Sequence, residues 1–196
     1  MILTANEKHV LRFLATSTGK DYSINHIAKM CKLTPNGAHK MLTKLEKEKV
    51  LKAKPIANLK AYKPDFESEK TMRVLELAFM PDTLERRIKL RAEDLKPFKA
   101  VTKACVLFGS YITTKKEPGD LDILFILERS NFEAYKQTLA KVQDLVPIKI
   151  QDVVQTTDDI QQNLKKNDPI ITEALRNGIV LWGFDVLVQV IKNAAP

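Results

Sequence analysis

Residues 104–127 read ACVLFGSYITTKKEPGDLDILFIL, and this stretch carries the most informative pattern of the chain. It holds two short apolar runs, residues 105–108 and 123–127, each bounded by turn-forming residues. Runs of this length and composition are typical of buried β-strands. We therefore predict two core strands joined by a polar segment that ends at Pro118-Gly119.

Two aspartates stand at the start of the second run. Side chains alternate between the two faces of a strand, so Asp120 and Asp122 should share one face, roughly 7 Å apart. Carboxylates at this spacing can bind a hard cation such as Mg²⁺. Gly109 and Ser110 offer backbone N–H groups and a hydroxyl to a phosphate, and no Cβ at Gly109 blocks its approach. The pattern predicts a site for phosphoryl or nucleotidyl transfer.

The order of apolar strand, Gly-Ser, spacer, and Asp-x-Asp entering another strand resembles the signature of the DNA polymerase beta-like nucleotidyltransferases. It is most similar to the minimal nucleotidyltransferases of prokaryotes, over residues 98–182. Residues 111–114 replace the small-residue and Arg-Gly pattern that the family often carries, and Gly119 replaces its usual Ser. Neither change removes a metal ligand. A polar turn that only joins two core strands is the alternative interpretation.

The resemblance also implies a set of site residues. The family has a third carboxylate on a strand that follows a helix, and Asp152, in the predicted strand 148–154, occupies that position. It would share the metal with Asp120 and Asp122 and help to deprotonate an attacking hydroxyl. The alternative is an edge-strand aspartate without a role. The cofactor would be magnesium or manganese, and the substrate a nucleoside triphosphate, with ATP preferred, bound by Gly109, Ser110, Lys115 and Lys116.

The composition indicates a globular protein. The 196 residues are enough for one domain or two small ones, and a hydrophobic content of 44% supports packed cores. No apolar run approaches the roughly 20 residues of a membrane span, and the N-terminus lacks the pattern of a signal peptide. The two cysteines, Cys31 and Cys105, are far apart and resemble ordinary buried thiols. We expect a cytoplasmic protein with no membrane partner.

The net charge of +8 is unevenly distributed. Residues 1–63 contain 13 Lys and Arg against 4 Asp and Glu, a balance of +9. Residues 64–196 contain 19 against 20, a balance of −1. The basic character therefore belongs to the N-terminal third. Such an asymmetry indicates a nucleic-acid-binding module attached to a second unit.

Three helix starts and a hairpin follow one another in that third. Thr4 and Glu7 form a capping-box pattern, Ser23 can cap a short helix, and Thr34-Pro35 is a strong helix start. Two strand-like runs around a turn at residues 55–58 then predict a basic β-hairpin. This order resembles the winged helix-turn-helix superfamily, in which the longer helix enters the DNA major groove and the hairpin follows the backbone.

Charge and resemblance together predict the DNA contacts. Lysines would neutralise phosphates, and the short polar side chains of Asn36 and His39 would reach base edges. The alternatives are a basic but solvated surface, or a winged helix used for protein contacts. The predicted DNA-contacting residues are Thr34, Asn36, His39, Lys40, Lys44, Lys54 and Lys60. No grouping of His and Cys suggests zinc.

Residues 68–79 and 83–95 show the spacing of two further helices. Helices after the wing commonly mediate dimerisation in winged-helix regulators, so the resemblance implies a homodimer as a candidate assembly. We predict an α+β chain. It comprises a winged helix-turn-helix at residues 1–64, a helical linker with a possible role in dimerisation at 65–97, and a nucleotidyltransferase-like α/β domain with a mixed sheet at 98–196.

Two functions compete on this basis. The first is a magnesium-dependent nucleotidyltransferase that moves NMP from an NTP to a hydroxyl of a partner macromolecule, with the winged helix bound to DNA. The resemblance favours a protein as the acceptor. The second is a transcription regulator whose C-terminal domain only senses a nucleotide and has weak or no catalysis. A DNA polymerase ranks last, since 196 residues leave little room for the elements that grip a template.

Overall fold

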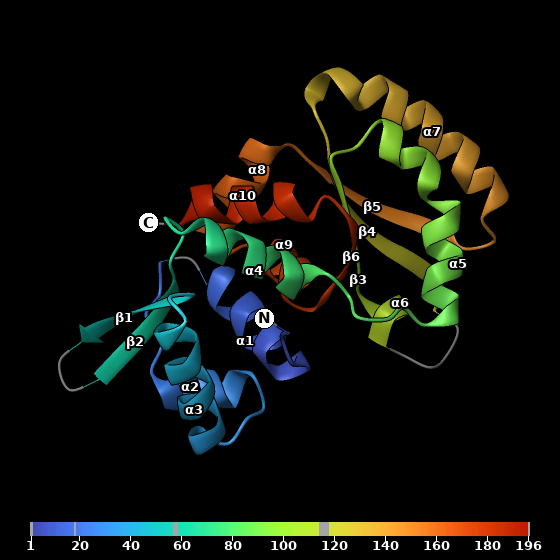
Figure 1. Cartoon of the computed structure of the whole chain (residues 1–196). Coiled ribbons are helices and arrows are strands. Elements are labelled where there is room, and N and C mark those ends of the chain that lie inside the picture. The colour runs from blue at the N-terminus through green and yellow to red at the C-terminus, as the bar shows by residue number, and fades with distance from the viewer. Residues whose placement is uncertain (1, 18, 57–58, 114–117, 196) are drawn as a thin grey trace.

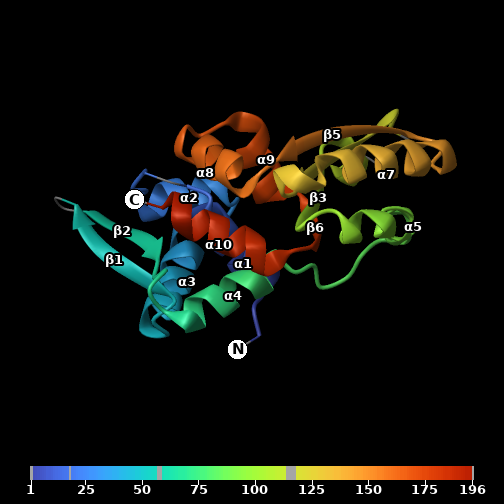
Figure 2. The same ribbon diagram turned by 90° about the horizontal axis from the view of Figure 1, so that it is seen from above.

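The computed structural model describes residues 2–17, 19–56, 59–113 and 118–195, and its fold is α+β, as predicted. Figure 1 shows helices and a small hairpin on one side, and a sheet flanked by helices on the other. From above, in Figure 2, the hairpin and helix α7 (Phe132–Leu145) lie at opposite ends of an elongated molecule. No helix in the described ranges is long and apolar enough to cross a membrane.

The N-terminal half begins with three helices that are capped as predicted. Thr4 and Glu7 form the capping box, in which the Thr4 backbone N–H donates to Glu7 Oε2 at 2.8 Å. The hydroxyls of Ser23 and Thr34 accept backbone N–H groups at the next two helix starts. These elements are α1 (Ala5–Ala15), α2 (Ile24–Met30) and α3 (Pro35–Lys47), followed by the antiparallel strands β1 (Leu51–Ile56) and β2 (Leu59–Pro64). The predicted hairpin turn includes residues 57–58, which lie outside the described ranges.

A four-stranded sheet in the order β5-β4-β3-β6 forms the centre of the C-terminal half. Its strands are β3 (Ala104–Phe108), β4 (Asp120–Ile126), β5 (Lys149–Gln155) and β6 (Ile179–Trp182). β4 runs parallel to β5, whereas β3 is antiparallel to both β4 and β6, so the sheet is mixed, as predicted. All residues of β3 are buried, because this strand lies inside the sheet and both of its faces are covered.

Aromatic side chains fill the core on one face of the sheet. The ring of Phe125 on β4 lies 4.6 Å from that of Phe98 and 5.4 Å from that of Tyr135, measured between centroids. Phe98 comes from the 3-10 turn η1 (Lys96–Ala100) and Tyr135 from α7. Helix α5 (Arg86–Asp94) contributes Ile88 to the same cluster.

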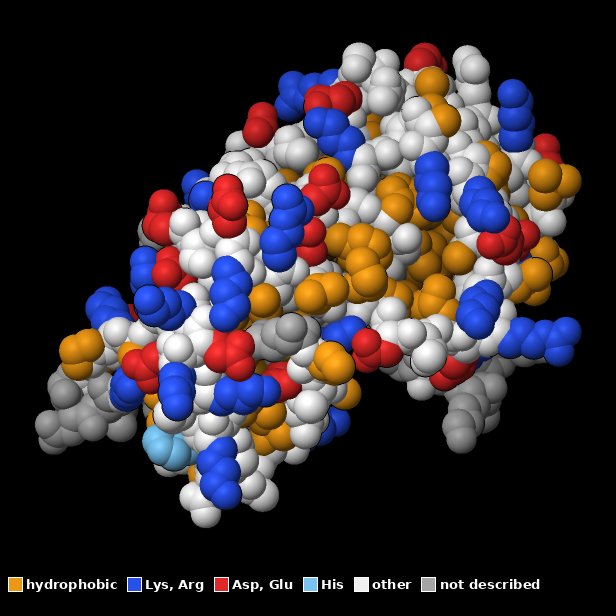
Figure 3. Space-filling view, viewed as in Figure 1, with side chains coloured by type: hydrophobic (Ala, Val, Ile, Leu, Met, Phe, Trp, Pro, Cys, Tyr) orange, Lys and Arg blue, Asp and Glu red, His pale blue; other side chains and the backbone are white. Residues whose placement is uncertain are grey.

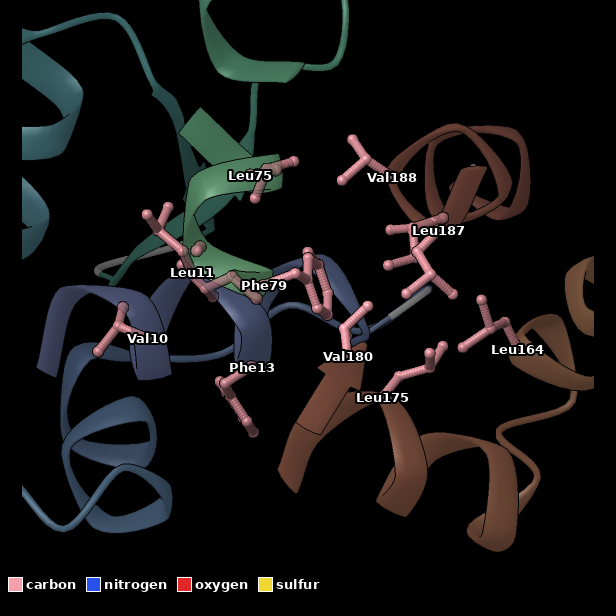
Figure 4. Close-up of a cluster of buried hydrophobic side chains, with 14 of the residues drawn as sticks. Val10, Leu11, Phe13, Leu75, Phe79, Leu164, Leu175, Val180, Leu187 and Val188 are labelled. Carbon is pink, nitrogen blue, oxygen red and sulfur yellow. The ribbon is translucent and has the colours of Figure 1, made fainter. Parts of the chain in front are cut away.

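The core on the other face continues into the N-terminal half. Helices α8 (Thr157–Lys165), α9 (Pro169–Asn177) and α10 (Phe184–Ala194) pack there, and α4 (Glu69–Phe79) lies against both α10 and α1. Figure 4 shows Leu11 of α1 on one side of this cluster, Leu187 of α10 on the other, and Phe79 of α4 between them. The predicted linker at residues 65–97 therefore contributes side chains to both cores.

Helix α5 begins at Arg86, three residues later than the predicted start at Thr83. The preceding segment is held against α1 by Lys8, whose Nζ donates to the Met80 carbonyl oxygen at 2.8 Å and to Asp82 at 2.5 Å. A tertiary contact of this kind leaves no local sequence signal, so the helix boundary could not be read from periodicity.

Two side chains of these helices depart from what their positions suggest. Asn131 stands at the N-cap position of α7, but its side-chain amide donates to the Val101 carbonyl oxygen and does not cap the helix. Leu77 on α4 is apolar but 43% exposed. Helix α8 was not predicted, although Thr156 and Asp159 form a capping box at its start.

Candidate functional site

Two half-buried carboxylates meet a glycine turn at one end of the sheet. Asp120 and Asp122 begin β4, and Asp122 lies opposite Phe108, the last residue of β3. Residues paired in register point to the same face of a sheet, and alternate residues of one strand do as well. Asp120 and Asp122 therefore share a face, as the sequence pattern predicts. The chain leaves β3 at Gly109 and turns at once into the short helix α6 (Ser110–Thr113).

Gly109 allows that turn to lie directly against Asp122. Its φ is +71°, in the left-handed region, and a Cβ at this position would lie 2.0 Å from Asp122 Oδ2. The backbone N–H of Ser110 donates a hydrogen bond to the Asp122 carboxylate. The structure thus brings Gly109 and Ser110 beside the carboxylates, whereas Lys115 and Lys116, predicted to hold triphosphate oxygens, lie outside the described residues.

The electrostatics of this pair favour a cation. Burial raises the pKa of the Asp122 carboxyl above its ordinary value, the negative charge of Asp120 raises it further, and the Ser110 hydrogen bond opposes both. Two carboxylates that repel each other at a half-buried position are stabilised when positive charge binds beside them.

The two carboxylates also fit the way proteins bind magnesium. Mg²⁺ is usually held by one or two carboxylates and completes its shell with water and substrate phosphates. Within the described ranges, no group of three His, Cys, Asp or Glu side chains is placed to hold a metal ion. Asp120 and Asp122 are a pair of carboxylates, the number and type of side chain with which proteins usually hold magnesium.

The structure does not bring Asp152 to this pair, which corrects the sequence prediction. β5 runs parallel to β4 and places Asp152 opposite Ile123, so its side chain points to the face covered by α7. There it accepts a hydrogen bond from the Tyr135 hydroxyl at 2.7 Å. The prediction failed because a shift of one residue in register moves a side chain to the other face. Asp152 cannot share a metal with Asp120 and Asp122 in this arrangement.

Gln151, which the sequence analysis did not single out, lies beside the pair instead. It is opposite Asp122 in register, and its Nε2 donates to Asp120 Oδ2 at 2.6 Å. The amide can orient the carboxylate, but an amide cannot act as a general base at neutral pH. The alternation within strand 148–154 would have indicated Gln151 only if the register with β4 were known.

Several of the predicted DNA-contacting residues lie together on an exposed face. Asn36, His39 and Lys60 line a hollow between the starts of α2 and α3 and the strand β2. Further along α3, Lys40 and Lys47 are exposed on the same helix face as Asn36 and His39, and neither forms an ion pair among the described residues. Thr34 serves as the helix cap.

Other lysines of this half pair with carboxylates. Lys44 Nζ lies 2.7 Å from Glu7, and Lys60 Nζ lies 2.7 Å from Glu46. Lys54 Nζ lies 3.6 Å from Asp21. Figure 3 shows the result, with Lys and Arg side chains interspersed with Asp and Glu over the hairpin side of the molecule. The pairs of Lys54 and Lys60 are exposed and contribute little to stability, so DNA phosphates can compete for these two lysines, whereas the partner of Lys44, Glu7, is buried.

Comparisons with known proteins add one family assignment. The model of DUF6932, described as a family of unknown function, matches residues 71–171, slightly more than half of the chain. No curated protein matches the chain.

Two solved structures of ZitR from Lactococcus lactis are similar to part of the chain. A mutant is 20% identical, with a TM-score of 0.32, over 51% of this chain and 60% of that one. The wild type is 17% identical, with a TM-score of 0.29, over 51% of this chain and 74% of that one. TM-scores of this size do not establish a common fold.

Proposed function

The chain belongs to DUF6932, a family of unknown function, and we propose that it is a DNA-binding regulator with a nucleotidyltransferase-like domain that binds a magnesium–nucleoside triphosphate. In this proposal, residues 1–64 form a winged helix-turn-helix and residues 98–196 form the nucleotide-binding domain. ATP is the expected ligand. The observation that carries the proposal is the packing of the Gly109 turn against Asp122.

This packing supports nucleotide binding for a physical reason. The left-handed glycine keeps side-chain atoms away from the carboxylates, so phosphates can approach the backbone closely. Asp120 and Asp122 would hold the magnesium, and the metal would neutralise part of the phosphate charge. Gly109 and Ser110 would contact the phosphates. Gln151 fixes the Asp120 carboxylate through its 2.6 Å hydrogen bond.

The N-terminal half supports the DNA-binding part of the proposal. Its order of three helices and an antiparallel hairpin supports this, because it is the order expected for a winged helix-turn-helix. The exposed face of α3 carries Lys40 and Lys47, and Asn36 and His39 lie nearer its start. These are the residue types that contact phosphates and base edges in a major groove.

NMP transfer is a second candidate, favoured by the shared face of Asp120 and Asp122. In that reaction, a hydroxyl of a partner macromolecule, for example a protein, attacks the α-phosphorus, and pyrophosphate leaves with the electron pair of the broken bond. The hydroxyl proton needs an acceptor. Asp152 lies on the opposite face of the sheet, and the side chain beside the pair is the amide of Gln151, which cannot accept this proton. We therefore rank nucleotide binding above NMP transfer.

Replacing Asp120 and Asp122 together by asparagine is expected to weaken MgATP binding by about 100-fold or more, because the cation loses both negative charges. Titration calorimetry with MgATP measures this. Asp152→Asn is the matched control, since it makes the same change on the opposite face and should bind MgATP normally. Equal affinity of the double variant and the parent protein would refute the proposed site.

The parent protein and the Asp120→Asn, Asp122→Asn variant also distinguish the two candidate functions, nucleotide binding and NMP transfer. Incubation with α-labelled ATP and magnesium in a lysate would label an acceptor only if transfer occurs. Label that requires Asp120 and Asp122 would establish the transferase. MgATP binding without label, together with DNA affinity that changes with nucleotide, would establish the regulator.

Replacing Lys40 and Lys47 together by alanine is expected to weaken DNA binding and to reduce its salt dependence. Two fewer phosphate contacts lower the slope of log K against log salt concentration by about 1.8. Fluorescence anisotropy with duplex DNA at several salt concentrations measures the slope. The double variant Lys141→Ala, Lys165→Ala removes two exposed lysines from α7 and α8 and is the control. A slope equal to that of the control would exclude α3 as the DNA-contacting helix.

A further inference from the structure

The contact between α1 and α9 contains a half-buried arginine, Arg12, which pairs with no carboxylate of the described residues. Arg12 Nη2 donates to the backbone oxygens of Leu175 at 2.7 Å and of Gly178 at 2.6 Å, around the end of α9. Burial lowers the pKa of Arg12 to about 10. The end of a helix supplies only about half a negative charge, so the guanidinium is only partly compensated there.

A second arginine, Arg176, extends from α9 to the end of α1. Arg176 of α9 donates from Nε to the Thr16 hydroxyl at 3.0 Å and from Nη2 to the Ser17 hydroxyl at 2.9 Å. Its guanidinium also lies over the ring of Phe13, 4.8 Å from the centroid. In the part of the chain that the structure describes, neither Arg12 nor Arg176 forms an ion pair with a carboxylate. Positive charge therefore accumulates between α1 and α9.

Two adjoining hollows open beside these arginines, with volumes of about 310 Å³ and about 430 Å³. His9, Arg176 and Asn177 line both of them. The larger hollow is also lined by Lys20 and by Thr172, whose buried hydroxyl has no hydrogen-bond partner among the described residues. We call these two hollows the α1–α9 cleft.

Acidic side chains do not cancel the charge of the cleft. Asp82 lines the smaller hollow, but Lys8 of the same hollow already pairs with it at 2.5 Å. Glu173 lines the larger hollow together with Lys20 and Arg176, so the cationic side chains described there outnumber the carboxylate. A buried positive charge is costly unless it is paired, so a site with this balance favours an anion.

We propose that the α1–α9 cleft binds a small phosphate-bearing anion. Guanidinium groups donate to phosphate oxygens with good geometry, and both hollows have volumes in the range of small-ligand sites. The anion would contact His9 and Lys20 from the N-terminal half and Arg176 from the C-terminal half. Binding would therefore strengthen the contact between the two halves, at a site separate from Asp120 and Asp122.

His9 distinguishes this proposal from a purely structural role of the arginines. Burial lowers the pKa of His9, and the positive charges of Arg12 and Lys32 lower it further. The other charged groups around the cleft are Lys8, Lys20, Arg176, Asp82 and Glu173. A phosphate beside His9 adds negative charge and must raise the pKa of this imidazole. Arginines that only join α1 to α9 give no such response.

The test is an NMR titration of the full chain with inorganic phosphate, in EDTA and at constant ionic strength. The protein carries Asp120→Asn and Asp122→Asn, so that the proposed nucleotide site is inactive. We expect the His9 pKa to rise. We also expect the Nε–H signals of Arg12 and Arg176 to shift along the same saturation curve as the His9 imidazole.

Variants then locate the bound phosphate. His9→Gln should weaken phosphate binding by about tenfold, through loss of a charged hydrogen bond, and Lys20→Ala by about fivefold. Neither side chain takes part in the hydrogen bonds that join α1 to α9, so both variants should fold. Lys29→Ala removes an exposed lysine of α2 outside the cleft and should leave the affinity unchanged.

An unchanged His9 pKa at saturating phosphate, or equal affinity in all three variants, would overturn the proposal. A parallel titration with AMP identifies the source of the phosphate. Tighter binding of AMP would place a nucleoside in the larger hollow beside Tyr22, and equal binding would assign the site to phosphate alone. Asp120 and Asp122 are already replaced in the protein used for these titrations. The phosphate and AMP results therefore do not depend on whether the proposed nucleotide site exists.

Discussion

Replacing Phe125 with alanine is expected to lower the free energy of unfolding by about 3–5 kcal/mol. Phe125 is fully buried near the end of β4, and its ring contacts those of Phe98 and Tyr135. Neighbours held by the sheet and by two covering elements cannot move inward far enough to fill the space, so a cavity should remain. Urea denaturation followed by circular dichroism measures the loss.

Phe132→Ala is the control for this prediction. Phe132 also stacks on Tyr135, at 6.5 Å between centroids, but it is 43% exposed. Its removal creates no enclosed cavity and should cost much less. If Phe125→Ala destabilised the protein no more than Phe132→Ala, the aromatic cluster would not be the tightly packed core described above.

Replacing Gly109 with alanine is expected to affect stability and nucleotide binding together. The new Cβ would lie 2.0 Å from Asp122 Oδ2, and a φ of +71° is strained for alanine. We expect a loss of about 1–3 kcal/mol in the free energy of unfolding, from backbone strain and displacement of the carboxylate. MgATP affinity should fall by about tenfold or more, because the displaced Asp122 carboxylate would no longer be positioned for the metal. Urea denaturation and calorimetry measure the two effects.

Gly119→Ala provides the comparison within the same β3–β4 connection. A Cβ at Gly119 would have no atom of the described residues within 4 Å, and the backbone there is not in the left-handed region. This variant should match the parent protein in stability and in MgATP binding. Equal behaviour of the Gly109 and Gly119 variants would mean that the turn does not approach the ligand.

The elements with strong local signals could be predicted from the sequence. Thr4, Ser23 and Thr34 mark helix starts through side-chain caps, and the structure places helices after all three. The common face of Asp120 and Asp122 follows from the alternation of a single strand, so it needed no information about neighbouring strands.

Relations between strands could not be predicted in the same way. The position of Asp152 depends on the register of β5 against β4, which the sequence of either strand alone does not specify. The role of Gln151 beside Asp120 was missed for the same reason. The clustering of Arg12 with Arg176 joins residues that are far apart in the chain, so only the fold reveals it.

The insertion of α4 between α1 and α10 has a consequence for how the protein could act on two targets. A flexible tether gives a second site a high effective concentration near the first and lets it search a volume set by linker length. Here the continuous core removes that freedom. The distance from the exposed face of α3 to Asp120 is set by packing, so a molecule that contacts both must span that fixed separation.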